Sequence, residues 1–247
     1  MERFSRFSRL AGEENLGRLR EASVTVFGVG AVGGWATEML ARCGIGKFRL
    51  IDPDCISVTN INRHVCALDS TVGIPKTEAV KARIRDINPA AEVEIFRVAA
   101  DSTNIGSLLA HRPDIVIDAI DSLGPKTDLL EYAFRNSIRV ISSMGAALKT
   151  DLTAIKSGDI SRTSVCPLAR NLRQALRKRG IDKGIRCVWS TELPDNNALI
   201  CAEDDPDRNE NPVQGAKRSL GSYPHVTAVF GIMIADEAIK AIIKKVP

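Results

Sequence analysis

The sequence lacks the paired cysteines that commonly form zinc sites or redox centres. Among its 247 residues are six cysteines, and no two of them form a C-x-x-C pair. Neither a zinc ribbon nor a thioredoxin-type motif is therefore indicated. Single cysteines scattered along a chain without an export signal favour reduced thiols and a cytoplasmic location. They are Cys43, Cys55, Cys66, Cys166, Cys187 and Cys201.

Targeting and membrane-spanning patterns are absent as well. The first ten residues, MERFSRFSRL, are charged and contain no apolar h-region, so we expect no signal peptide. The most apolar stretch, residues 225–243, includes Asp236, Glu237 and Lys240, which favours an amphipathic or core helix over a bilayer-spanning one. The sequence therefore predicts no stable membrane insertion.

What is present is an alternation of strand and helix patterns. Short β-branched runs predict buried strands, and stretches of helical apolar spacing separate them. This order predicts right-handed crossovers and a doubly wound, mostly parallel, Rossmann-like α/β sheet. The expected strands span residues 23–28, 47–52, 93–98, 114–121 and 139–144, and the expected helices span 33–44, 75–89, 104–112 and 125–137.

The pattern weakens after Gly145. We expect a strand and turn at 151–160, a basic helix at 167–180, a strand at 184–192 and a last helix from about Pro224. Residues 192–224 are polar and rich in Asn, Asp and Pro, and a loop of that length is usually functional or disordered. We therefore expect one domain over residues 1–247, with a less regular C-terminal extension whose residues 145–224 face the substrate.

A glycine motif, G-x-G-x-x-G, stands between the first expected strand and helix. Gly28 permits a tight turn, Gly30 lets the backbone approach a phosphate, and Gly33 allows close helix–strand packing. The following helix N-terminus offers N–H donors and a positive dipole to an anion. Asp52 follows the next strand, where an acid can bind ribose hydroxyls. The alternative interpretation is a glycine-rich packing turn without a ligand.

Three further residues argue against a nicotinamide dehydrogenase. Arg63 and Lys76 place two cations near the phosphates, which suits a triphosphate better than a pyrophosphate already held by a helix dipole. Asp121 lies just beyond a buried strand, where ligands bind in such sheets, and a carboxylate there can hold Mg²⁺. Singly, Arg63 and Lys76 could be solvated surface charges and Asp121 a helix cap. Jointly, they predict ATP and magnesium.

Three stretches, residues 28–63, 72–80 and 118–122, and the segment RFSRL near the start carry a resemblance to a known family. Over Arg6 to about Met144 the chain resembles the adenylating domain of the ubiquitin-activating (E1)-like ThiF/MoeB/HesA group. The resemblance implies a homodimer in which Arg9 reaches the ATP of the partner subunit. It also implies that Arg63, Lys76, Asp121 and Arg9 are catalytic and that Asp121 holds magnesium. The nucleotide-binding residues that it implies are Gly28, Gly30, Gly33, Asp52, Asp54, Asn60, Arg63, Lys76 and Asp121.

Two later segments narrow the resemblance. Sulfur-carrier-activating members usually carry two C-x-x-C pairs, and this chain has none. Its residues 163–181 and 185–192 instead resemble the tRNA threonylcarbamoyladenosine dehydratases. That subfamily implies ATP-dependent closure of the threonylcarbamoyl group of a tRNA adenosine into a ring, with tRNA as the partner. A partner from a sulfurtransferase system stays open.

The implied chemistry needs no enzyme nucleophile, because an adenylated carboxylate can be attacked by the neighbouring carbamoyl group. Cys187 could be a nucleophile or sulfur acceptor, but a free cysteine in an apolar strand is more often core filling. The remaining alternatives are an activator of a ubiquitin-like or sulfur-carrier protein, a NAD-dependent oxidoreductase, and a relative that only senses ATP.

A basic stretch from Arg162 to Arg186 contains a single acid, Asp182. Such a run is usually a solvated helix face. A tRNA is a polyanion, however, and a basic helix could bind its backbone. The residues expected to bind RNA are Arg173, Arg177 and Lys178.

Overall fold

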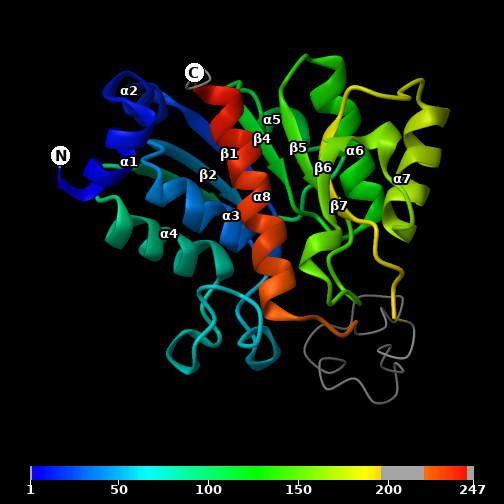
Figure 1. The fold of residues 1–247 in the computed structure, drawn as a ribbon, viewed down its shortest axis with the longest axis horizontal. Helices are drawn as coiled ribbons and strands as arrows, with labels where there is room; N and C mark the ends of the chain where they lie inside the picture. The colour runs from blue at the N-terminus through cyan, green and yellow to red at the C-terminus, as the bar shows by residue number, and fades with distance from the viewer. Residues whose placement is uncertain (1, 196–219, 244–247) are drawn as a thin grey trace.

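A computed structural model describes residues 2–195 and 220–243, which form a single sheet flanked by helices (Figure 1). The sheet has seven strands in the order β3-β2-β1-β4-β5-β7-β6, and every neighbouring pair is parallel except β6 with β7. This confirms the predicted doubly wound, mostly parallel α/β fold. The strands are β1 Ser23–Phe27, β2 Lys47–Ile51, β3 Glu92–Phe96, β4 Ile115–Asp118, β5 Val140–Ser143, β6 Ile155–Asp159 and β7 Arg186–Ser190.

Helices cover both faces of the sheet, and each face has its own apolar cluster. One cluster joins the sheet to α2, α3, α4 and α8, and the other joins it to α5, α6 and α7. The helices are α1 Ser5–Ala11, α2 Glu13–Glu21, α3 Ala31–Arg42, α4 Lys76–Ile87, α5 Ile105–Leu108, α6 Leu123–Arg135, α7 Pro167–Lys178 and α8 Pro224–Ile242. Short 3-10 turns lie at Glu2–Phe4, Val58–Asn60, Asp69–Thr71, Leu152–Ala154 and Ile160–Arg162.

Strands β1 and β4 lie side by side at the centre of the sheet. All four residues of β4 are buried, and so are four of the five in β1, as expected for strands covered on both faces. Phe27 is in register with Ile51 on one side and with Asp118 on the other. From β1 the chain winds outward to β2 and β3, whereas β4 begins the other half. The carboxyl ends of β1 and β4 therefore mark the switch point of the sheet, where a ligand-binding crevice is expected in such folds.

The part of the chain after Gly145 extends the same sheet. Strand β7 pairs parallel with β5, β6 forms an antiparallel edge, and α8 packs closely along α3 (Figure 1). A Cβ at Gly231 would lie 2.5 Å from the Val32 carbonyl oxygen, so glycine is needed for this helix contact. Of the expected substrate-facing segment 145–224, residues 196–219 lie outside the described residues. None of the described helices is both long and apolar enough to cross a membrane.

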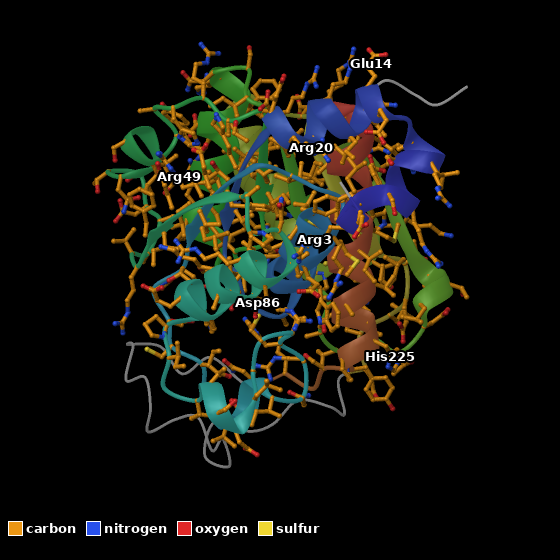
Figure 2. The ribbon with its side chains drawn as sticks, turned by 90° about the vertical axis from the view of Figure 1, so that its left-hand side faces the viewer. Arg3, Glu14, Arg20, Arg49, Asp86 and His225 are labelled. Carbon is orange, nitrogen blue, oxygen red and sulfur yellow. The ribbon has the colours of Figure 1, made fainter. Side chains whose placement is uncertain are left out.

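Helices α1 and α2 were not predicted, and they lie at the amino end of the sheet. Phe4 and Leu16 approach Gly44 just after the end of α3, and Arg3 donates to the Asp86 carbonyl oxygen near the end of α4 at 2.9 Å. Figure 2 shows Glu14 and Arg20 of α2 at the other end of the molecule from His225, at the start of α8. The N-terminal helices therefore lie away from the carboxyl ends of β1 and β4.

Candidate nucleotide site at the carboxyl edge

The glycine turn after β1 is packed against the segment that follows β4. Gly28 has a φ of 83°, and a Cβ there would lie 2.8 Å from the Ala119 carbonyl oxygen. A Cβ at Gly33 would lie 1.8 Å from the Gly28 carbonyl oxygen. At Gly30, by contrast, a Cβ would meet no protein atom within 4 Å, and φ is −74°. Contacts within the protein therefore require the first and third glycines but not the second, and the close approach of a phosphate to Gly30 stays a prediction.

Asp52 braces this turn from the end of β2. The carboxylate is 5% exposed; one oxygen accepts from the Val29 N–H at 2.9 Å and the other from the Asp54 N–H at 2.9 Å. Burial raises the pKa of Asp52, against the opposing effects of Lys76 and of these two N–H donors. Its predicted contact with ribose stays a prediction, since the bonds seen here serve the turn itself.

Asp54 and Lys76 face each other where the long loop between β2 and α4, residues 52–75, begins and ends. Lys76 Nζ lies 2.8 Å from Asp54 Oδ2, and the Lys76 N–H donates to the Asp54 carbonyl oxygen at 2.9 Å. The lysine side chain is 13% exposed and the aspartate side chain 46%. Because Lys76 is the first residue of α4, its charge adds to the helix dipole. An anion in the crevice can compete with Asp54 for this ammonium group.

Arg63 and Asn60 lie in one turn of the same loop. The Arg63 guanidinium donates to the Thr59 carbonyl oxygen at 2.6 Å and to Asn62 Oδ1 at 3.0 Å. The Asn60 carbonyl oxygen accepts from the Arg63 N–H at 3.0 Å, and the Trp35 indole N–H donates to the Arg63 carbonyl oxygen at 3.2 Å. The backbone of this turn is thus fixed against α3, beside the glycine turn.

A buried ion pair shapes the loop that carries Asp121. Lys126 and Asp118 are both fully buried, and Lys126 Nζ lies 2.7 Å from Asp118 Oδ2. The same carboxylate accepts from Ser142 Oγ at 2.6 Å, and Lys126 also donates to the Ile120 carbonyl oxygen at 3.0 Å. Asp121 is exposed at the end of this loop. Sequence reasoning missed Lys126, because lysine near a helix start ordinarily indicates a surface charge.

The residues present fit a magnesium ion that travels with a nucleotide. Within residues 2–195 and 220–243, no group of three or more His, Cys, Asp or Glu side chains is arranged to hold a metal ion. Mg²⁺ is commonly bound through one or two carboxylates together with substrate phosphates and water. Asp121, at the crevice and beyond the buried Asp118, is placed to supply one such carboxylate.

Two groups of predicted residues lie apart from the crevice. Arg9 is exposed on α1, at the amino end of the sheet. On α7, Arg173 donates to the Thr163 carbonyl oxygen at 2.8 Å and is half-buried, so part of its hydrogen-bonding capacity is already used. Arg177 Nε lies 3.4 Å from Asp182 Oδ1, and the Lys178 side chain is exposed.

Cys187 lies in the core. It is fully buried in β7, and burial raises the pKa of its thiol to about 12. A thiol with that pKa is not a nucleophile near neutral pH, because the reactive form is the thiolate. The structure therefore favours the interpretation of Cys187 as core filling.

A glycine turn and an acidic loop that meet at the switch point of a mostly parallel sheet are typical of nucleotide-binding α/β proteins. The chain belongs to the ThiF family, which its residues 3–247 match. It is 37% identical over 249 residues to the tRNA threonylcarbamoyladenosine dehydratase of Bacillus subtilis, covering 100% of this chain and 96% of that protein. It is 29% identical over 133 residues to the molybdopterin-synthase adenylyltransferase of Escherichia coli, covering 54% of this chain and 52% of that protein.

The fold is similar to solved structures of the tRNA N6-threonylcarbamoyladenosine dehydratase of Escherichia coli. The complex of that enzyme with AMP superposes with a TM-score of 0.86 at 36% identity, covering 98% of this chain and 94% of the other. Its complex with ATP gives a TM-score of 0.85 at 35% identity, covering 98% and 93%. The family expected from the sequence is thereby confirmed.

Proposed function

We propose that the chain is an ATP-dependent tRNA-modifying enzyme. It adenylates the carboxylate of threonylcarbamoyladenosine in tRNA and allows the group to close into a ring with loss of water. AMP and pyrophosphate are the other products. The reaction itself transfers no sulfur, and a partner from a sulfurtransferase system stays a prediction.

One observation favours this function over that of an activator of a ubiquitin-like or sulfur-carrier protein. The likeness to the dehydratases runs through essentially the whole chain, including the part after Gly145, whereas the likeness to the molybdopterin-synthase adenylyltransferase covers about half of it. The full-length likeness therefore supports an RNA nucleoside as the acceptor.

ATP would be bound at the carboxyl edge. Gly28, Gly30 and Gly33 shape the phosphate turn, and the N-terminus of α3 supplies N–H donors. Arg63 and Lys76 would contact the phosphates, with Asp52, Asp54 and Asn60 around the nucleotide. Lys76 would then exchange Asp54 for a phosphate oxygen. Magnesium bound with the nucleotide at Asp121 would neutralise phosphate charge.

The residues support activation of an acid. A carboxylate is a poor electrophile because its leaving group would be oxide, and attack on the α-phosphate replaces that leaving group by AMP. Arg63 and Lys76 would stabilise the charge that develops on the departing pyrophosphate. The carbamoyl nitrogen or oxygen then attacks its own activated carbonyl carbon, and AMP leaves. Because this second step is intramolecular, positioning replaces covalent catalysis.

The tRNA backbone would lie along α7. Arg177 and Lys178 present positive charge to solvent there, whereas Arg173 contributes less because it donates to Thr163. In a homodimer, Arg9 would reach the ATP bound by the partner subunit. The placement of α1 at the amino end supports a role in a second copy over a role in its own crevice.

The acceptor is tested by measuring AMP release with three substrates: tRNA bearing threonylcarbamoyladenosine, the same tRNA transcribed without the modification, and the modified tRNA after ribonuclease digestion. We expect AMP only with the intact modified tRNA. AMP release that persists after digestion, and that depends on a small sulfur-carrier protein, would select the alternative.

A further inference from the structure

His64 is a buried side chain that the proposed reaction does not use. It is 4% exposed, follows Arg63 in the loop of residues 52–75 and packs against the glycine turn. Its Nε2 is 2.7 Å from the Val29 carbonyl oxygen, and its Nδ1 is 3.0 Å from the Cys66 backbone nitrogen. A Cβ added to Gly34 would lie 3.6 Å from the same Nε2, so the ring is enclosed on the side of α3 as well.

These two partners fix the protonation of the ring. A carbonyl oxygen can only accept, so Nε2 carries a proton and donates it to Val29. A backbone N–H can only donate, so Nδ1 carries none and accepts from Cys66. His64 is therefore the neutral Nε2–H tautomer. Burial, with the charges of Lys76 and Arg63 opposing a third positive charge, lowers its pKa to about 4, so the ring is neutral at physiological pH.

Val29 is the residue between Gly28 and Gly30, and both of its peptide groups are held by side chains. Asp52 accepts from its N–H, and His64 donates to its carbonyl oxygen. The peptide that carries the Val29 carbonyl also carries the Gly30 N–H, so the bond from His64 sets the direction of that N–H. The direction of backbone N–H groups is what a glycine turn offers to a phosphate.

We propose that His64 is a positioning residue for the nucleotide: by holding the Val29 carbonyl oxygen, it orients the Gly30 N–H toward the phosphates. This inference rests on the proposed binding of ATP at the glycine turn. The ring touches neither the nucleotide nor the substrate and acts only through the turn. Its effect therefore falls on ATP affinity, whereas loss of Lys76 lowers turnover even at saturating ATP.

Two isosteric substitutions separate the two hydrogen bonds. In His64→Gln the side-chain amide nitrogen reaches the place of Nε2 and can still donate to Val29, whereas in His64→Asn the amide group reaches only the place of Nδ1. Asn88→Leu is the stability control, since it removes a buried hydrogen bond to the Ile45 carbonyl oxygen away from the turn. ATP titration by calorimetry, without tRNA, is done at a temperature where circular dichroism shows all variants folded.

We expect His64→Gln to bind ATP like the wild type, and His64→Asn to bind about tenfold more weakly, a change of ~1.4 kcal/mol. Asn88→Leu should be less stable than the wild type with unchanged ATP affinity. Wild-type affinity in His64→Asn would overturn the inference and leave the proposed function standing. A wild-type protein that binds no ATP would overturn both.

A second measurement needs no variant. Nitrogen-15 spectra of histidine-labelled wild-type protein should show His64 as the Nε2–H tautomer with no titration between pH 5.5 and 8. An Nδ1–H tautomer, or a titration midpoint near 6.5, would contradict the hydrogen bond to Val29 and with it the positioning role.

Discussion

Lys76 Nζ and Asp54 Oδ2 lie 2.8 Å apart, and this ion pair joins the two ends of the loop between β2 and α4. Both residues belong to the proposed nucleotide site, and in this structure each is the ionic partner of the other. A triphosphate in the crevice offers Lys76 several stronger acceptors than one carboxylate. In the proposed nucleotide site, the ion pair would hold the ammonium group at the crevice until a nucleotide replaced Asp54.

The first prediction concerns turnover. Lys76→Ala should slow AMP formation by about 10²–10³-fold, the range for removal of one electrostatic group that stabilises developing charge. Lys81→Ala is the matched control, because it removes the same charge from a later position in the same helix α4. AMP formation is measured at saturating ATP with modified tRNA. Equal rates in Lys76→Ala and Lys81→Ala would remove Lys76 from the site.

The second prediction concerns magnesium. Asp121→Asn should lose most turnover and require more Mg²⁺ for its half-maximal rate, because an amide binds this cation less strongly than a carboxylate. Asp128→Asn, which removes a carboxylate that pairs with Arg179 on the outside of α6, should leave the magnesium dependence unchanged. The measurement is the rate of AMP formation across a magnesium titration. An unaltered titration curve in Asp121→Asn would show that this carboxylate does not hold the ion.

The third prediction concerns stability. Lys126→Met should lower the free energy of unfolding by about 3–5 kcal/mol, because the Asp118 charge would remain buried without its partner. Adding Asp118→Asn should recover part of that loss, since the remaining amide carries no charge. Urea denaturation of the single and double variants measures both changes. A loss below about 1 kcal/mol in Lys126→Met would mean that the pair contributes no more than an exposed one.

The fourth prediction concerns pH and follows from His64. Its pKa is about 4 in the folded protein against 6.5 in the unfolded chain, so between these values the unfolded chain binds the extra proton. The stability that the neutral ring provides is therefore complete above pH 6.5 and is lost as the pH falls toward 4, by about 3 kcal/mol in all. The difference in unfolding free energy between wild type and His64→Gln should change across that window. Parallel pH profiles would contradict the buried neutral ring.

The fifth prediction concerns RNA. Replacing Arg177 and Lys178 together by alanine should weaken tRNA binding and reduce the log–log salt slope by roughly one unit per lost phosphate contact. ATP affinity should be unchanged. Arg20→Ala with Lys47→Ala removes the same charge from the amino end of the sheet and serves as the control. If both double variants show the same affinity and the same slope as the wild type, α7 is not the RNA-binding surface.

The sheet and the glycine turn could be predicted because their signals are local. Parallel strands that are buried on both faces are apolar along their length, and Gly28 and Gly33 are required by contacts that follow from a strand–turn–helix arrangement. Asp121 could be placed at the carboxyl edge for the same reason, since it follows a buried strand directly.

What the sequence could not reveal depends on contacts between distant residues. His64 reaches Val29 across 35 positions, and nothing near either residue indicates the bond. Lys126 was missed because only its full burial beside Asp118 distinguishes it from a solvated lysine. Arg173 was expected to face RNA, and its bond to Thr163 became visible only in the fold. In each case tertiary packing, which sequence spacing does not encode, determines what the side chain binds.

Mass spectrometry of nucleosides shows directly whether the protein converts threonylcarbamoyladenosine in tRNA. Modified tRNA is incubated with the protein, ATP and Mg²⁺, digested to nucleosides under mild conditions and compared with a reaction that lacks ATP. We expect threonylcarbamoyladenosine to be converted, only with ATP, into a product lighter by one water, with one AMP formed for each nucleoside converted. Unchanged threonylcarbamoyladenosine in a reaction where the protein demonstrably binds ATP would contradict the proposed function.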